Sequence, residues 1–265
     1  MPVNTDIKDG WRVFRIMAEF VDGFETMAKV GKAVSIFGSA RTPPDDPYYK
    51  AAEETGRRLV KAGYAVITGG GPGIMEAGNK GASEARGKSI GLNITLPHEQ
   101  ESNRYVNIGM DFHYFYARKV MFVKYASAFI CFPGGFGTLD ECFETLTLIQ
   151  TLKIKPFPVI LYGTEFWTGL VEWMRRRLTP DFINPEDTDI FRIVDRPQDA
   201  VAIVRESQKH YWWKPGDHKL SAKGEKENGP VVGGGHIEGG EGTRYGVRPK
   251  RTTKKHLTAP RKPVR

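Results

Sequence analysis

Short apolar segments alternate with longer amphipathic ones along most of the chain. Each apolar segment ends in a polar or glycine-rich turn, and apolar residues then recur every three or four positions, which is the spacing of one helical face. The predicted strands are 33–37, 64–68, 89–94, 110–114, 128–132, 157–162 and 193–194. The predicted helices that follow them are 46–62, 74–86, 116–125, 138–152, 166–178 and 197–208.

This alternation predicts an α/β fold. Strands that are apolar throughout are typical of a parallel sheet whose two faces are both covered by helices. We therefore expect a Rossmann-like, doubly wound and mainly parallel sheet with helices on both faces. In such sheets ligands bind outside the carboxyl ends of the strands, where the strand order changes direction.

Two segments lie outside this pattern. Residues 9–30 carry apolar residues at mostly helical spacings, which predicts an amphipathic helix that packs on the core or on another subunit. The chain is therefore divided into an N-terminal helical extension (1–31), a nucleotide-binding catalytic domain (32–213) and a basic tail (214–265).

The excess positive charge lies in the tail. Residues 214–265 contain 13 Lys and Arg against 5 Asp and Glu, whereas the rest of the chain contains 26 of each kind. The folded part is therefore balanced, which argues against a nucleic-acid-binding role for it. The tail is rich in glycine and poor in apolar residues, so we expect it to be disordered, either without function or in weak contact with a polyanion.

Cysteine usage and hydropathy indicate a cytoplasmic protein. Cys131 and Cys142 are the two cysteines, and their spacing is not that of a redox or metal motif. The sequence has neither an N-terminal apolar signal segment nor an apolar run of about 20 residues, so no membrane contact is expected. We expect both thiols to be reduced and to serve as small buried apolar groups.

The most informative segment is 133–141, Pro-Gly-Gly-Phe-Gly-Thr-Leu-Asp-Glu, which joins an apolar strand to a helix. Gly134, Gly135 and Gly137 let backbone N–H groups approach an anion, and Thr138 adds a hydroxyl. The helix N-terminus supplies further N–H donors and a partial positive charge. The segment predicts a phosphate-binding turn, with Glu141 one turn into the helix.

Two other turns end predicted strands. Gly70 and Gly71 belong to the glycine-rich turn 69–73, and Ser39 follows the first strand. Contact with phosphate or ribose and a purely structural role are both open for these residues, because glycine turns between strand and helix are common. The spacings match neither a P-loop nor a dinucleotide-binding fingerprint.

The segment 133–141, together with Arg118-Lys119, resembles the LOG family of cytokinin riboside 5′-monophosphate phosphoribohydrolases, many of which were labelled lysine decarboxylases. The resemblance covers roughly 33–162. It implies hydrolysis of the N-glycosidic bond of a nucleoside 5′-monophosphate to free base and ribose 5-phosphate. It also implies a homodimer or a larger homo-oligomer.

The resemblance implies that Arg118 and Glu141 are the catalytic residues. A carboxylate beside the ribose can stabilise its developing positive charge, hold its hydroxyls or activate water, and an arginine can grip phosphate or polarise the departing base. The alternative for Glu141 is a contribution of about 0.3–1 kcal/mol at its helix N-terminus. No cofactor is expected, and His113 is not expected to bind a metal, because it has no second ligand at a suitable spacing.

The sequence departs from the plant-like members of the family just before Arg118, where residues 114–117 are Tyr-Phe-Tyr-Ala. The base is therefore open, and AMP and a prenylated cytokinin nucleotide are both candidate substrates. The alternative function is that of a carrier that binds a nucleotide or the molybdenum cofactor without cleaving it.

Overall fold

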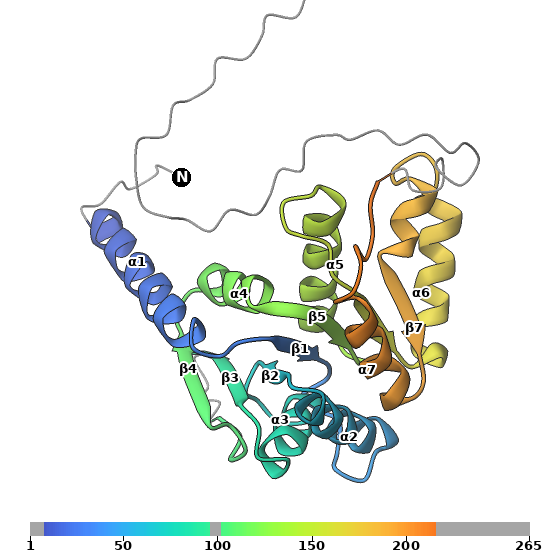
Figure 1. Cartoon of the computed structure of the whole chain (residues 1–265). Helices are drawn as coiled ribbons and strands as arrows, with labels where there is room; N and C mark the ends of the chain where they lie inside the picture. Colours follow the sequence, from blue (N-terminus) through green and yellow to red (C-terminus); the bar gives the residue numbers. More distant parts are fainter. Residues whose placement is uncertain (1–7, 96–101, 216–265) are drawn as a thin grey trace, which may run out of the picture. The chain divides into compact units, whose positions relative to one another are not determined.

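The computed structural model describes residues 8–95 and 102–215. Its strands form one seven-stranded sheet in the order β4-β3-β2-β1-β5-β6-β7, and all neighbouring strands are parallel (Figure 1). The strands are β1 (Ala33–Phe37), β2 (Ala65–Thr68), β3 (Ser89–Ile94), β4 (Ile108–Phe112), β5 (Ala126–Cys131), β6 (Val159–Tyr162) and β7 (Phe191–Val194). The predicted parallel sheet is confirmed.

Helices cover both faces of the sheet, as predicted. They are α1 (Lys8–Met27), α2 (Pro47–Lys61), α3 (Ile74–Glu84), α4 (Phe115–Lys124), α5 (Phe136–Gln150), α6 (Thr164–Arg177) and α7 (Pro197–Glu206). One apolar core joins α2, α3 and α7 to one face, and a second joins α1, α4, α5 and α6 to the other (Figure 1). The fold is therefore a three-layer α/β sandwich.

Side chains alternate between these two cores along each strand, because successive residues of a strand point to opposite faces. In β1, Val34 and Ile36 belong to the core under α2, α3 and α7, whereas Ala33 and Phe37 belong to the other. Every residue of β1 is buried. Since each fully buried Val, Ile or Phe side chain contributes about 1.5–3 kcal/mol, the apolar strands hold both helical layers to the sheet.

The strand order changes direction beside β1. From β1 the chain adds β2, β3 and β4 in one direction, and it then returns to place β5, β6 and β7 on the other side of β1. The turns that follow β1 and β5 therefore flank the switch point, where doubly wound sheets bind their ligands.

Most boundaries differ from the prediction by one or two residues. β4 lies two residues earlier than predicted, since its pairing with β3 runs from Ile108 to Phe112. Part of this strand is exposed, so an apolar pattern does not identify its start. A 3-10 helix at Pro185–Asp189 was not predicted. α5 begins at Phe136 instead of 138, so Glu141 is the sixth residue of the helix, more than one turn from its start.

The N-terminal helix was predicted and is α1. Its second half packs on α4, where Met121 fills the space that the absent side chain of Gly23 leaves.

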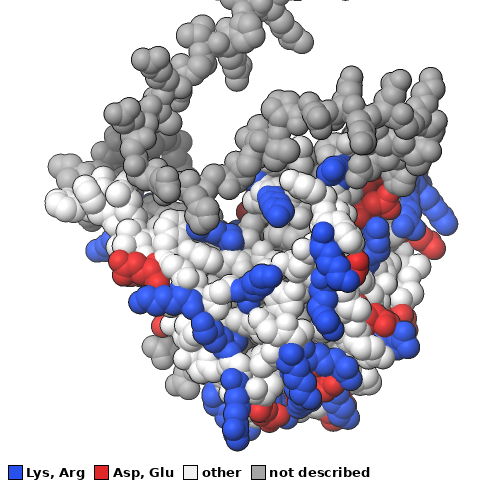
Figure 2. Space-filling view, viewed as in Figure 1, with Lys and Arg blue, Asp and Glu red and all other residues white. Residues whose placement is uncertain are grey.

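Nearly all of the tail 214–265 lies outside the described residues, so the division of the chain into three parts stays a prediction. Charged side chains of both signs occur on the face of the molecule seen in Figure 2. No helix in 8–95 or 102–215 is long and apolar enough to cross a membrane.

Candidate active site

The turns that follow β1, β2 and β5 meet at the carboxyl edge of the sheet. The backbone N–H of Ser39, after β1, donates to the carbonyl of Pro133, after β5, over 3.0 Å. The carbonyl of Ser39 in turn accepts from the N–H of Ile74, at the start of α3, over 3.0 Å. The structure thus brings the three sequence-predicted turns together at the switch point.

The turn after β5 leads directly into α5. Gly135 is the N-cap residue of the helix and offers no side-chain cap, and the space around the Cα atoms of Gly135 and Gly137 is open. The first N–H groups of a helix have no acceptor within it. Thr138 is buried, and its hydroxyl packs under Gly134. This end of α5 therefore has the donors and the room for an anion.

The turn after β2 is held by a buried polar network. Gly70 has a φ of +74°, and a Cβ there would overlap the side-chain oxygen of Asn93, so only glycine fits. The side-chain amide of Asn103 donates to the carbonyls of Gly70 and Gly71, each over 3.0 Å, and to Oδ1 of Asn79 over 2.9 Å. These bonds fix the second turn against α3.

Glu141 lies on α5 and is only 7% exposed. Its Oε2 is buried and has no hydrogen-bond partner among the residues that the structure describes. Burial raises the pKa of Glu141 to about 7, against the opposing effect of Lys119 and Arg118. A carboxyl group with this pKa can accept or release a proton at neutral pH.

Arg118 lies on α4 and reaches the turn after β2. Its Nε donates to the carbonyl of Leu92 over 2.8 Å, and its guanidinium lies 5.2 Å from the ring centre of Phe122. A Cβ on Gly69 would come within 2.5 Å of one Nη atom, so the guanidinium occupies the space that this glycine leaves. Burial lowers the pKa of Arg118, and the Glu141 carboxylate counteracts this shift.

Lys119 is adjacent to Arg118 but faces α5. Its Nζ forms ion pairs with Asp140 at 2.7 Å and Glu144 at 2.9 Å. Burial works against the charge of the lysine, but these two carboxylates hold its pKa above the usual range. Lys119 therefore ties α4 to α5, and this tie fixes the relative positions of the helices that carry Arg118 and Glu141.

The side chains that support the turns were not predicted from the sequence. Asn79 is completely buried in α3 and bonds to Thr68 and to Ser89. Asn93, in β3, donates to Asp111 over 3.0 Å and also bonds to Ser102. The available signal was a polar residue at a position where the periodicity requires an apolar one, which marks a buried hydrogen-bonding role.

Two predicted roles concern residues beside the site. Cys131 and Cys142 are both buried and free, and a hydrogen bond with the Cys142 side chain, together with burial, raises the pKa of Cys131. His113 is exposed and packs edge-on against Tyr114. Within 8–95 and 102–215 there is no group of three or more His, Cys, Asp and Glu side chains that could hold a metal.

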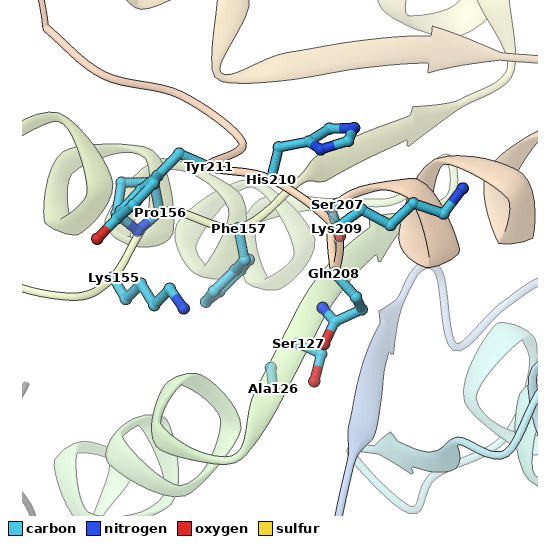
Figure 3. A pocket seen from close by; sticks show the side chains of 10 residues that line it. All are labelled: Ala126, Ser127, Lys155, Pro156, Phe157, Ser207, Gln208, Lys209, His210 and Tyr211. Carbon is cyan, nitrogen blue, oxygen red and sulfur yellow. The ribbon is translucent and has the colours of Figure 1, made fainter.

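A cavity of about 410 Å³ lies at the opposite, amino edge of the sheet (Figure 3). Its walls come from the start of β5, the loop before β6 and the segment after α7, and they include Lys155, Phe157, Gln208 and Tyr211. The glycine turns, Arg118 and the N-terminus of α5 do not line this cavity. We assign the candidate site to the carboxyl edge, because the buried carboxylate and the free helix N-terminus are found there.

The sequence of this chain is similar to those of known proteins. The profile of a family described as "Possible lysine decarboxylase" matches residues 75–204. The Arabidopsis thaliana protein named cytokinin riboside 5′-monophosphate phosphoribohydrolase LOG1 is 29% identical over 198 residues, 72% of this chain and 88% of that protein. A Rhodococcoides fascians protein of the same enzyme name is 26% identical over 179 residues, 66% of this chain and 89% of that protein. The resemblance to the LOG family is confirmed.

Solved structures share the fold of this LOG-like chain. The molybdenum cofactor carrier protein from Chlamydomonas reinhardtii has a TM-score of 0.52 at 20% identity, over 68% of this chain and 99% of that one. The molybdenum cofactor binding protein from Rippkaea orientalis has a TM-score of 0.51 at 21% identity, over 67% and 97%. At these identities the likeness shows a common fold.

Proposed function

We propose that this protein hydrolyses the N-glycosidic bond of a nucleoside 5′-monophosphate. Water adds to C1′ of the ribose, the bond from C1′ to the base nitrogen breaks, and the products are ribose 5-phosphate and the free base with a proton on that nitrogen. The observation that carries this proposal is Glu141, a buried carboxyl group with an unpaired oxygen and a pKa of about 7. It stands near Arg118 at the ligand-binding edge of the sheet.

The 5′-phosphate binds at the N-terminus of α5. Gly134, Gly135 and Gly137 provide the close backbone approach, and Thr138 completes the first turn. The open space at Gly135 and Gly137 supports this assignment, since a phosphate can reach the helix N–H groups without a steric clash.

The nucleoside lies across the switch point, toward the turns after β1 and β2. Gly70, Gly71 and Ser39 line this side. The assignment is supported by the backbone hydrogen bonds that hold Ser39 between Pro133 and Ile74, because these bonds keep all three turns at fixed distances from one ligand.

Glu141 acts on the ribose. Positive charge develops on the sugar ring as the bond to the base breaks, and a carboxylate in a water-poor site stabilises that charge far more than it would in water. The same carboxylate accepts a proton from the attacking water, and with a pKa near 7 it returns that proton to solvent after the reaction.

Arg118 acts through fixed positive charge. A guanidinium does not give up its proton in a protein, so general acid catalysis is not its role. Its Nε is already bonded to the carbonyl of Leu92, which fixes the plane of the group and leaves the Nη atoms for phosphate or for the departing base. The charge also favours the ionised form of Glu141.

The relatives' name points to cytokinin riboside 5′-monophosphates as substrates, and the departure at 114–117 makes AMP an equal candidate. The alternative, a carrier that binds a nucleotide or cofactor without cleaving it, stays a prediction, as does the cytoplasmic location. A carrier does not need a buried carboxyl group that can exchange protons near neutral pH. The raised pKa of Glu141 therefore supports the enzymatic function over the carrier function.

The test is to incubate the full-length protein with AMP and with N6-isopentenyl-AMP and to measure free base by chromatography. Glu141→Gln keeps the shape of the side chain and removes its charge, and we expect the rate to fall by about 10²–10⁴-fold. The matched control is Glu144→Gln, on the same helix and in an ion pair with Lys119. Its rate should fall less than about fivefold, since a partly exposed pair contributes at most about 1 kcal/mol.

Three results would separate the possibilities. Base release that depends on Glu141 supports the proposal. An unchanged rate in Glu141→Gln would remove Glu141 from the chemistry. Tight nucleotide binding without any free base after prolonged incubation would favour the carrier.

A further inference from the structure

Among the residues that the structure describes, three buried side-chain oxygens have no hydrogen-bond partner: Glu141 Oε2, Thr145 Oγ1 and Thr179 Oγ1. Buried polar atoms are hydrogen-bonded in nearly all cases in native proteins, so each exception requires a physical explanation. Two of these three oxygens belong to α5, and their residues are four positions apart. We therefore looked for one explanation of both.

Glu141 and Thr145 lie on the same face of α5. Side chains at positions i and i+4 of a helix are neighbours, with Cβ atoms about 5–6 Å apart. Both residues belong to the buried side of α5. Thr145 is completely buried, and Glu141 is 7% exposed with almost no contribution from Oε2. The two unpartnered oxygens therefore lie inside the protein, one helical turn apart.

The hydroxyl of Thr145 differs from those of three other helical threonines. Thr55, Thr147 and Thr168 each donate to the backbone carbonyl four residues earlier, over 2.7–2.9 Å. This local bond is a common one for a threonine inside a helix. The hydroxyl of Thr145 does not make it. It is therefore free for a partner outside the backbone of the helix.

Thr145 is too deep in the protein to touch a nucleotide. α5 begins at the turn after β5 and runs away from the carboxyl edge, so Thr145 lies one turn further from this edge than Glu141. Any effect of its hydroxyl on the chemistry must pass through Glu141. The spacing suits one water molecule, because two O–H···O bonds of about 2.7–2.8 Å span about 5.5 Å and a buried water needs at least two polar partners.

We propose that one buried water molecule joins Thr145 Oγ1 to Glu141 Oε2, and that Thr145 is a positioning residue for this carboxylate. The Thr145 hydroxyl donates to the water, and the water donates to Oε2. The ionised carboxylate thus gains a hydrogen bond from inside the protein, and Oε1 is left to face the ligand. The catalytic consequence rests on the proposed function, whereas the contact itself does not.

The charged and titratable groups around Glu141 come from three elements. They are Arg118 and Lys119 on α4, Asp140 and Glu144 on α5, and Cys131 on β5. Burial has the largest effect on the pKa of Glu141 and opposes ionisation, as do the two carboxylates, whereas the two cations favour it. A substitution of Thr145 leaves all of these groups in place. Its effect on the pKa of Glu141 therefore reports on the hydroxyl.

The first test is Thr145→Val, which keeps the shape of the side chain and removes the hydroxyl. Because the ionised carboxylate loses a hydrogen bond, the pKa of Glu141 should rise by about one further unit. In the pH profile of kcat/KM for AMP or N6-isopentenyl-AMP, the midpoint of the acidic limb should move up by about one pH unit. The rate should then fall about tenfold at pH 6 and less than about twofold at pH 9.

Two further variants control this profile. Thr145→Ser keeps the hydroxyl and should keep the midpoint of the wild type. Thr147→Val is the matched control, because Thr147 is exposed on the same helix and its hydroxyl already donates to a backbone carbonyl. Its midpoint should not move. A lower rate of Thr145→Val at every pH, with an unchanged midpoint, would overturn the proposal, since Thr145 would then serve only in packing.

The second test does not need activity. Urea unfolding of the wild type and Thr145→Val at pH 5 and pH 9 compares the neutral and the ionised form of Glu141. Relative to the wild type, Thr145→Val should be less stable at pH 9 than at pH 5, because its native state holds the proton to a higher pH. This pH dependence should vanish when both proteins also carry Glu141→Gln.

The two tests separate the contact from the catalytic function. If the pH dependence of stability is found but no variant releases base, the contact is supported and the proposed function fails. If the stability difference between the wild type and Thr145→Val is the same at both pH values, the contact is refuted, whatever the activity.

Discussion

Polar groups lie at both the carboxyl and the amino edge of the sheet, but the charged groups are exposed at the amino edge and buried at the carboxyl edge. At the amino edge, the walls of the cavity in Figure 3 carry cations that meet solvent or aromatic rings: Lys155 lies 5.8 Å from the ring centre of Tyr211. His210 and Lys209 both pair with the exposed Glu206. At the carboxyl edge, Glu141 is buried without a hydrogen bond to Oε2 in the described part of the chain.

The volume of a cavity is therefore a poor guide to the position of the active site in this fold. Exposed ion pairs contribute about 0–1 kcal/mol and leave both groups close to their behaviour in water. A buried carboxyl group with an unpaired oxygen is unfavourable for the apoprotein, and such groups persist where a ligand completes them. The strand topology points to the same edge, because the switch point lies between β1 and β5.

After Glu141→Gln, the largest loss of activity is expected from Arg118→Ala. Loss of a fixed cation at the reacting centre should lower kcat/KM for the nucleotide by about 10²–10³-fold, as for other preorganised electrostatic donors. Base release measured by chromatography provides the rates. The control is Lys155→Ala, which removes one cation from the amino-edge cavity. A loss in Lys155→Ala that equals the loss in Arg118→Ala would reverse the comparison of the two edges.

The second prediction concerns stability, and it follows from the raised pKa of Glu141. In the native protein this carboxyl group stays protonated up to about pH 7, whereas a glutamic acid in the unfolded chain loses its proton near pH 4.3. Between these values the native state binds more protons, so the contribution of Glu141 to the free energy of unfolding falls as the pH rises. Above about pH 7 the full penalty is reached, at most about 4 kcal/mol.

Glu141→Gln should therefore be more stable than the wild type at pH 8 and about equally stable at pH 4.5. Urea unfolding of both proteins at the two pH values measures the difference. The control is Glu172→Gln, on the exposed surface of α6, which should change stability by less than about 0.5 kcal/mol. A lower stability of Glu141→Gln at pH 8 would show that the carboxylate is stabilised in the native site, and the contrast between the edges would then weaken.

The sequence predicted the sheet and the glycine turns because both leave local signals. The apolar strands and the turn 133–141 are contiguous in the chain, so their pattern identifies them directly. The partnership of Arg118 with Glu141 came from the family resemblance, since the two residues are on different helices. The carboxylates that hold Lys119 depend on how α4 packs against α5, which no periodicity encodes.

The buried polar side chains that hold the turns were the hardest part of the site to predict from the sequence. The amide of Asn103 reaches Asn79 and the turn after β2 from a loop that precedes β4. Loop residues have no hydrophobic period, and a single asparagine has no preferred partner in sequence. The start of α5 was placed two residues late for a related reason: Phe136 is 92% exposed, so its side chain gives no packing signal for the first turn.

The smallest loss of activity is expected from Gly69→Ala, which tests the position of the Arg118 guanidinium at the carboxyl edge. In Gly69→Ala, the new Cβ would lie 2.5 Å from an Nη atom of Arg118 and 2.7 Å from the sulfur of Met75, so the guanidinium must shift. A displacement of about 1 Å can cost up to about 10²-fold in rate, and we expect a loss of about tenfold in kcat/KM.

Gly169→Ala is the matched control, because a Cβ at this position of α6 meets nothing within 4 Å. It should keep its activity and gain up to about 1 kcal/mol of stability from the higher helix propensity of alanine. The two variants distinguish a displacement of the Arg118 guanidinium from a loss of stability. Gly69→Ala should lose activity at temperatures where it is still fully folded, as judged by circular dichroism. If Gly69→Ala retains wild-type activity, the Arg118 guanidinium does not act from beside the turn after β2, and its role must be sought in another conformation of α4.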